Sequence, residues 1–246
     1  MRYWLTPAAD EPPEERDDKI ADVCGVYREA PGRVAAGERV LSTDEMTGVQ
    51  ALERAAPGLP LRPGKVERRE FEYIRHGTLS FIINFDVVSG QVMCPSVGPT
   101  RTEADFLAHI RSTVESDPSV TRWHVVADNL NTHCSASLVR YVAELSGITD
   151  DLGSKGRCGV LKSMATRAAF LTDAGHKVVF HYTPKHASWL NQVEIWLSIL
   201  VRKLLRRGNF VSTDDLRNQV LDFIAYFNRT MAKPFKWTFL GKPLQA

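Results

Sequence analysis

Three carboxylates stand at positions where a carboxylate could do chemistry: Asp44, Asp128 and Glu194. Asp44 follows the short apolar segment 40–43, Asp128 follows WHVVA at 123–127, and Glu194 falls in the first two turns of an expected long helix. Hard oxygen ligands of this kind bind Mg²⁺ or Mn²⁺. Two such ions about 4 Å apart activate an attacking oxygen and stabilise a leaving one. The pattern alone keeps other interpretations open: a turn at a strand end for each Asp, and a partly exposed helix charge for Glu194.

The expected helix at 188–207 is apolar on almost every side. At 100° per residue its polar residues fall on one narrow face, which carries Asn191, Glu194, Ser198, Arg202 and Arg206. A carboxylate between so many apolar neighbours needs a partner, a metal ion or water. This polar face therefore makes Glu194 the most informative of the three acids.

The elements that must position these acids follow from periodicity and from turn residues. We expect a β-hairpin at 77–97 with its turn at Ser89-Gly90, a helix at 102–116 capped by Thr102, and a buried strand at 123–127. After these we expect a helix at 135–145, a loop at 149–162, a helix at 163–171, a strand at 177–182, and helices at 188–207 and 213–229, the last capped by Thr213. Strands paired early and alternating with helices late predict an α/β fold, a mixed sheet flanked by helices on both faces.

Composition and charge narrow the class of protein. The net charge is only +2, but residues 10–22 hold seven acids and two bases, while 202–207 holds four bases and no acid. A polyanion would meet the second region. No apolar run approaches 18 residues and no signal-peptide pattern opens the chain, so we expect no membrane partner. Four scattered cysteines are typical of free thiols in a reducing cytosol, which predicts a cytoplasmic protein.

Longer strings around the acids resemble a known family. VLSTDEMTGVQALER, VVADNLNTH and HYTPKHASWLNQVEIWLSILVRKLL are similar to the insertion sequence 630 family of bacterial transposases, which are distant relatives of the mariner group. The resemblance runs from about Asp22 to Leu244. It implies a ribonuclease-H-like fold and a DDE triad that holds two Mg²⁺ or Mn²⁺ ions, with Asp44 first, Asp128 second and Glu194 third. The family does not make Glu45 a ligand.

The resemblance also implies an activity and its partners. These are metal-dependent DNA strand cleavage and strand transfer in cut-and-paste transposition, with double-stranded DNA as transposon end and as target. A homodimer on DNA at the bacterial nucleoid is implied as well. The corresponding domains are an arm at 1–38 with one short helix near 18–27, a catalytic domain at 39–232, and a tail at 233–246.

Two departures from the family pattern leave alternatives open. Asp128 and Glu194 are 66 residues apart, about twice the usual gap, which we attribute to an inserted loop at about 147–173. Only 43 residues precede Asp44, too few for the helix-turn-helix region that recognises transposon ends. The chain would then work with a separate helix-turn-helix product. Alternatively it is a silent truncated remnant, a non-catalytic oligomerisation partner or a repurposed host nuclease.

Other residues are weighed as supporting groups. We expect Asn129, His133, His186 and Asn191 to surround the acids, against the alternative of turn asparagines and structural histidines. Trp189 would stack on a base or pack in the core. A phosphate-tracking surface, against the alternative of a merely solvated face, would comprise Lys155, Arg157, Lys162, Arg167, Lys185, Arg202, Lys203, Arg206 and Arg207.

Overall fold

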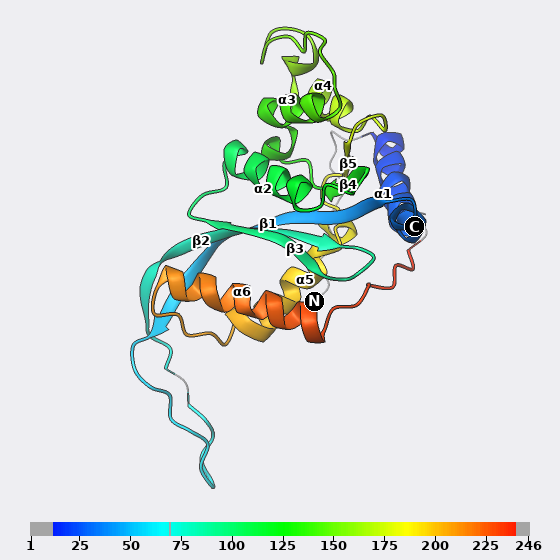
Figure 1. Ribbon diagram of the computed structural model, residues 1–246. Helices are drawn as coiled ribbons and strands as arrows, with labels where there is room; N and C mark the ends of the chain where they lie inside the picture. The colour runs from blue at the N-terminus through cyan, green and yellow to red at the C-terminus, as the bar shows by residue number, and fades with distance from the viewer. Residues whose placement is uncertain (1–11, 69, 240–246) are drawn as a thin grey trace.

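A computed structural model describes residues 12–68 and 70–239 of the chain. Its centre is a five-stranded sheet in the order β3-β2-β1-β4-β5 (Figure 1). The strands are β1 (Glu38–Arg54), β2 (Tyr73–Asp86), β3 (Val92–Gly98), β4 (Arg122–Ala127) and β5 (Val178–Tyr182). β1 pairs antiparallel with β2 and parallel with β4, so the sheet is mixed, as the sequence predicts.

Helices cover both faces of the sheet. α2 (Glu103–Ser116), α3 (Ala136–Leu145) and α4 (Met164–Leu171) lie on one face, and α5 (Val193–Leu200) and α6 (Thr213–Thr230) lie on the other (Figure 1). Side chains alternate along a strand, so Leu41 and Ile82 enter the core beneath α2 and α3. Phe81 and Ile83 enter the core beneath α5 and α6. Short 3-10 turns at Asn131–Cys134, Val160–Lys162 and Ser188–Leu190 link these elements.

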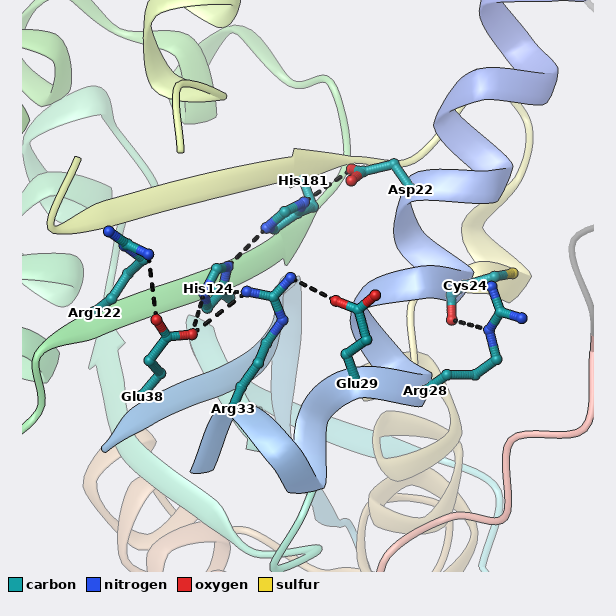
Figure 2. A network of polar contacts seen from close by, with 9 residues as sticks. All are labelled: Asp22, Cys24, Arg28, Glu29, Arg33, Glu38, Arg122, His124 and His181. Atoms are coloured by element: carbon teal, nitrogen blue, oxygen red, sulfur yellow. Dashed lines mark hydrogen bonds and ion pairs between the residues drawn. The ribbon is translucent and has the colours of Figure 1, made fainter. Parts of the chain in front are cut away.

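The first helix, α1 (Pro13–Ala35), packs against β1 and β5. The sequence predicts one short helix near 18–27 in an arm, but the helix has 23 residues, and Val23, Cys24 and Ala30 are fully buried. A polar network joins α1 to the strands, with His181 between Asp22 and His124, and Glu38 contacting His124 and two arginines (Figure 2). Its apolar spacing over several turns makes this helix part of the core.

Several boundaries differ from the expectations. β1 does not end at residue 43 but continues to Arg54, so Asp44 lies within a strand and pairs with Ile83. The expected helix at 188–207 is interrupted. It consists of a 3-10 turn, then α5, then a π-helical turn at Val201–Leu205. Ser212, not Thr213, caps α6, because its hydroxyl accepts from the Asp215 amide at 3.0 Å.

Other expectations are confirmed. Thr102 caps α2 in a reciprocal capping box with Asp105, and α3 and α4 lie within the expected helices at 135–145 and 163–171. The turn between β2 and β3 contains Ser89-Gly90. Part of the expected arm, residues 1–11, and part of the expected tail, residues 240–246, lie outside the described residues. Of the helices in 12–68 and 70–239, none combines the length and the apolar character needed to cross a membrane.

Candidate active site

Asp44 points toward the face of the sheet that α5 covers. Its Oδ1 accepts from the backbone amide of Glu45 at 2.7 Å, and its Oδ2 accepts from the Asn191 side chain at 3.3 Å. Burial raises the pKa of Asp44 to about 7, and the nearby charges of Asp128 and Glu194 add to this rise, against the opposing effect of the Glu45 amide. The group thus holds a proton more tightly than an ordinary Asp.

Asp128 directly follows β4, where its Oδ1 accepts from the Leu130 amide at 3.1 Å. The same oxygen lies 2.8 Å from Nδ1 of His133, whose Nε2 lies 3.1 Å from Oε1 of Glu45. Burial alone would lower the pKa of His133, but these two carboxylates raise it to about 10. Each ring nitrogen faces a carboxylate oxygen, an arrangement that favours the charged imidazole, which donates from both nitrogens. Burial would raise the pKa of Asp128, but the hydrogen bond from His133 holds it below its ordinary value.

Glu194 lies in the first turn of α5, and contacts with β1 and α1 fix the start of that helix. The Ser42 hydroxyl accepts from the Val193 amide at 2.8 Å and donates to the Asn191 side chain. The Tyr27 hydroxyl of α1 donates to the Leu190 carbonyl at 3.0 Å. Burial and the charge of Asp128 raise the pKa of Glu194.

The three acids form one electrostatic group, because Asp44 feels the charges of the other two and Glu194 feels that of Asp128. Crowded carboxylates repel one another, and a divalent cation is the usual counter-charge for oxygen donors. The donor set therefore fits Mg²⁺ or Mn²⁺. The acids do not form a ready-made cage, since in the part of the chain that the structure describes no three His, Cys, Asp or Glu side chains are arranged to hold a metal ion.

The residues expected to support the acids have different surroundings. Asn191 is buried and donates to the Asp44 carboxylate and to the Thr43 carbonyl. Asn129 donates to the Thr183 carbonyl at 2.6 Å, which joins the ends of β4 and β5. His186 is exposed in the loop after β5, with a left-handed backbone φ of 59°. Trp189 does not pack in the core, because it is 54% exposed and meets Phe239 edge-on.

The basic residues expected to track phosphates do not all reach the surface. Arg167 is buried, and its guanidinium donates to the carbonyls of Cys134 and Leu161, so the expectation that it faces DNA is corrected. Because its donors bond to buried carbonyls, the Arg167 side chain stabilises the packing of these segments. The exposed basic residues, apart from Lys185, fall into two groups whose elements lie on opposite faces of the sheet (Figure 1). Lys185 lies beside α1. The insert carries Lys155, Arg157 and Lys162, and the π-helical turn and its end carry Arg202, Lys203, Arg206 and Arg207.

The sequence does not predict the contacts that three further residues make near the acids. Glu45, Ser42 and Tyr27 make the contacts described above, but none of them stands out by type or spacing. A usable signal for Glu45 and Ser42 is strand alternation. If β1 is extended through Asp44, Ser42 falls on the same face as Asp44 and Glu45 falls on the other. Tyr27 has no such signal, since its partner is 163 residues away.

Comparison with known proteins gives the family and the fold. The model of the DDE superfamily endonuclease family matches residues 39–217. The chain is similar to the Mos1 mariner paired-end complex with Mn (12% identity, TM-score 0.53), which covers 92% of this chain and 60% of that one. It is also similar to the Mos1 transposase paired-end complex with left transposon end (10%, 0.52, 92% and 59%) and to the Mos1 strand transfer complex (12%, 0.51, 92% and 58%). No curated protein matches.

At this low identity the solved structures show the fold alone, and they confirm the predicted ribonuclease-H-like mixed sheet. The chain spans about three-fifths of the length of the transposase chains it matches. The family match rests on separate ground, since it covers most of the chain and contains all three acids. The chain therefore belongs to the DDE superfamily endonuclease family.

Proposed function

We propose that this protein is the catalytic part of a transposase of the insertion sequence 630 type, which cuts DNA and transfers the cut strand. The observation that carries the proposal is the meeting of three carboxylates from β1, the end of β4 and the start of α5. Burial and mutual repulsion raise the pKa of Asp44 to about 7. Three crowded carboxylates carry more negative charge than the one imidazolium of His133 offsets, so a divalent cation can balance the rest.

The proposed reaction has two phosphoryl-transfer steps. In the first, water attacks a phosphorus at the transposon end, the bond from phosphorus to the 3′ oxygen breaks, and a 3′-hydroxyl and a 5′-phosphate result. In the second, the freed 3′-hydroxyl attacks a phosphorus of the target, loses its proton to solvent, and releases the target's own 3′-hydroxyl. Each step forms and breaks one phosphorus–oxygen bond, so no oxidant or reductant is needed.

Asp44, Asp128 and Glu194 would hold two divalent ions, Mg²⁺ or Mn²⁺. When bound, these ions supply Lewis-acid stabilisation of the attacking and leaving oxygens. The chain supplies orientation. Asn191 and the Glu45 amide fix both oxygens of Asp44, and His133 fixes Asp128. Ser42 and Tyr27 hold the start of α5, and with it Glu194.

The proposed partners are double-stranded DNA and further protein chains. The exposed basic residues after α5 suit a phosphate backbone, and they lie in the same helical run as Glu194. Two transposon ends that must be cut together favour a homodimer on DNA. A separate product with a helix-turn-helix would supply end recognition. Such work would take place at the nucleoid in the bacterial cytoplasm.

Nicking of a labelled DNA duplex by the purified chain tests this function. We expect nicking in Mg²⁺ or Mn²⁺, none in EDTA, and none by Asp128→Ala, because that variant removes a central carboxylate. Asp214→Ala, an exposed acid in the first turn of α6, is the matched control and should nick like the unchanged chain. Nicking that Asp128→Ala retains would contradict the assignment.

The alternative is a catalytically silent remnant or a non-catalytic oligomerisation partner. It predicts no nicking by the chain under any metal condition, also after a helix-turn-helix product and transposon-end DNA are added. Nicking that appears only after this addition would instead support a two-part enzyme.

A further inference from the structure

Asp44 and Glu45 are neighbours in the chain but serve opposite faces of the sheet. Asp44 pairs with Ile83, whose side chain enters the core beneath α5 and α6. Glu45 pairs with Ile82, whose side chain enters the core beneath α2 and α3. Because successive side chains of a strand point to opposite sides, the Glu45 carboxylate cannot join Asp44 on the α5 face.

Among the described residues, His133 is the side chain that hydrogen-bonds the Glu45 carboxylate. Its Oε1 lies 3.1 Å from Nε2 of His133, and Nδ1 of the same ring lies 2.8 Å from Oδ1 of Asp128 and 3.1 Å from its backbone oxygen. The Phe106 ring packs against the imidazole at a tilt of 37°, with centroids 4.2 Å apart. One imidazole thus spans from the middle of β1 to the end of β4.

This bridge is closed to solvent. The side chains of Glu45 and His133 are 1% and 0% exposed, and the second Glu45 oxygen is buried with no hydrogen-bond partner among the described residues. Burying a carboxylate and an imidazolium is costly, and apolar residues of the same volume would fill the space at least as stably. Stability alone therefore does not account for the Glu45–His133 pair. Its evident effect is to fix the position of the Asp128 carboxylate relative to β1.

We infer that Glu45 is a positioning residue that acts through His133 to hold the Asp128 carboxylate in place for a divalent ion. This role rests on the proposed function, since it presumes that Asp128 is a metal ligand. The Glu45 amide orients Asp44 at 2.7 Å, so one residue places both aspartates, one through its backbone and the other through its side chain. Groups that orient metal ligands in this way typically change metal affinity 10- to 100-fold.

The test is a titration of the full chain with Mn²⁺, in which electron paramagnetic resonance measures the concentration of the free ion. We expect Glu45→Ala to weaken Mn²⁺ binding about tenfold or more. Glu45→Gln, which keeps an acceptor oxygen for His133, should stay within about threefold of the unchanged chain by the same reasoning. If Glu45→Ala does not fold, Glu45→Asp takes its place, because it keeps the charge but shortens the reach by one methylene.

A matched control lies at the other end of the β1 segment that pairs with β4. Glu38 contacts His124 of β4 at 3.0 Å (Figure 2), and it precedes Asp44 by six positions in β1. Glu38→Ala also removes a contact between a glutamate and a histidine, so it should lower the melting temperature but leave Mn²⁺ affinity within about twofold. Equal Mn²⁺ affinity in Glu45→Ala and the unchanged chain, or an equal loss in Glu38→Ala, would overturn the inference.

Crystal structures without metal separate this inference from the proposed function. In Glu45→Ala we expect the Asp128 carboxylate to leave its place, and in Glu38→Ala we expect it to stay. If the unchanged chain bound no Mn²⁺, the proposed metal chemistry would fail. The displacement of Asp128 would then decide by itself whether Glu45 positions it, and an unmoved Asp128 would overturn that role.

Discussion

Asp44 and His109 show how burial at one position sets the charge that a side chain carries. Asp44 meets two other carboxylates and has its pKa raised to about 7. His109 is 1% exposed, and burial lowers its pKa to about 3. The first group is costly to ionise and so favours a cation nearby, while the second stays neutral. Each makes a separate prediction.

Asp44→Asn should change how the chain responds to metal. Without metal, removing one of three repelling charges should leave the melting temperature unchanged or higher. With Mn²⁺ at about 100 times its dissociation constant, the unchanged chain should gain about 2.7 kcal/mol, and the variant should gain much less because a ligand is lost. Thermal unfolding with EDTA and with Mn²⁺ checks this. Asp214→Asn is the control, and equal stabilisation of Asp44→Asn would contradict the prediction.

His109 should make the chain less stable in mild acid. Its Nδ1 shares a hydrogen bond with Ser96 at 2.8 Å, and its Nε2 has no partner among the described residues. The unfolded chain takes up this proton near pH 6.5, whereas the folded chain does so only near pH 3. The stability from neutral His109 is thus full above about pH 6.5 and is lost as pH falls toward 3, by up to about 1.36 kcal/mol per pH unit.

Urea unfolding at pH 7.5, 6 and 5 measures this slope, with His109→Asn as the variant. Asn retains a polar group near the position of Nδ1 but does not titrate, so its stability should fall less steeply. His124 continues to contribute in both proteins, because burial lowers its pKa to about 4. Identical slopes in the two proteins would show that His109 is not held neutral.

At the scale of elements, the site depends on where helices begin. α5 starts at Val193, where Ser42 of β1 accepts from the Val193 amide and donates to the Asn191 side chain. Tyr27 of α1 bonds to the Leu190 carbonyl and the Gln192 amide just before it. α1 lies outside the span that the family model matches, yet it supplies this contact. The start of the helix that carries Glu194 is therefore held from two sides.

Tyr27→Phe tests the contribution of α1. The hydroxyl donates to the Leu190 carbonyl and accepts from the Gln192 amide at 3.3 Å. Its loss leaves two buried backbone groups unpaired and should cost about 1–3 kcal/mol in the free energy of unfolding. Tyr141→Phe, on α3, is the matched control and should cost less. Urea denaturation measures both, and an equal loss in the two variants would mean that the hydroxyl of Tyr27 contributes nothing special.

The sequence predicts the elements well where the local pattern decides and fails where distant contacts decide. Neighbouring residues alone are enough to predict capping residues such as Thr102 and the buried strand β4. β1 runs past Asp44 because β2 pairs with it as far as Arg54, which no residue near Asp44 indicates. The interruption at Asn191 and the burial of Arg167 likewise arise from partners far along the chain. The three acids, His133 and Asn191 follow from residue type and resemblance, whereas Ser42, Tyr27 and the contact of Glu45 with His133 need the fold.

At the scale of the whole molecule, a net charge of +2 conceals a separation of charge. The acid-rich start of α1 and the exposed base-rich turn after α5 come from opposite ends of the chain. Of the two exposed basic groups, the one after α5 continues the helix of Glu194, while the one in the insert lies across the sheet. Lys155 in the insert is also paired with Glu103 at 3.3 Å. The turn after α5 is therefore the better candidate for phosphate contacts near the acids.

Two triple variants compare these groups directly. One changes Arg202, Lys203 and Arg206 to Gln, and the other changes Lys155, Arg157 and Lys162 to Gln. Binding of a short duplex at several salt concentrations gives the slope of log K against log salt, which is about −0.9 for each phosphate that a cation neutralises. The first variant should bind more weakly and lose about 0.9 of slope for each contact removed, while the second should keep nearly the slope of the unchanged chain. The reverse ranking would place the DNA over the insert, and equal small effects in both variants would mean that neither group contacts the duplex.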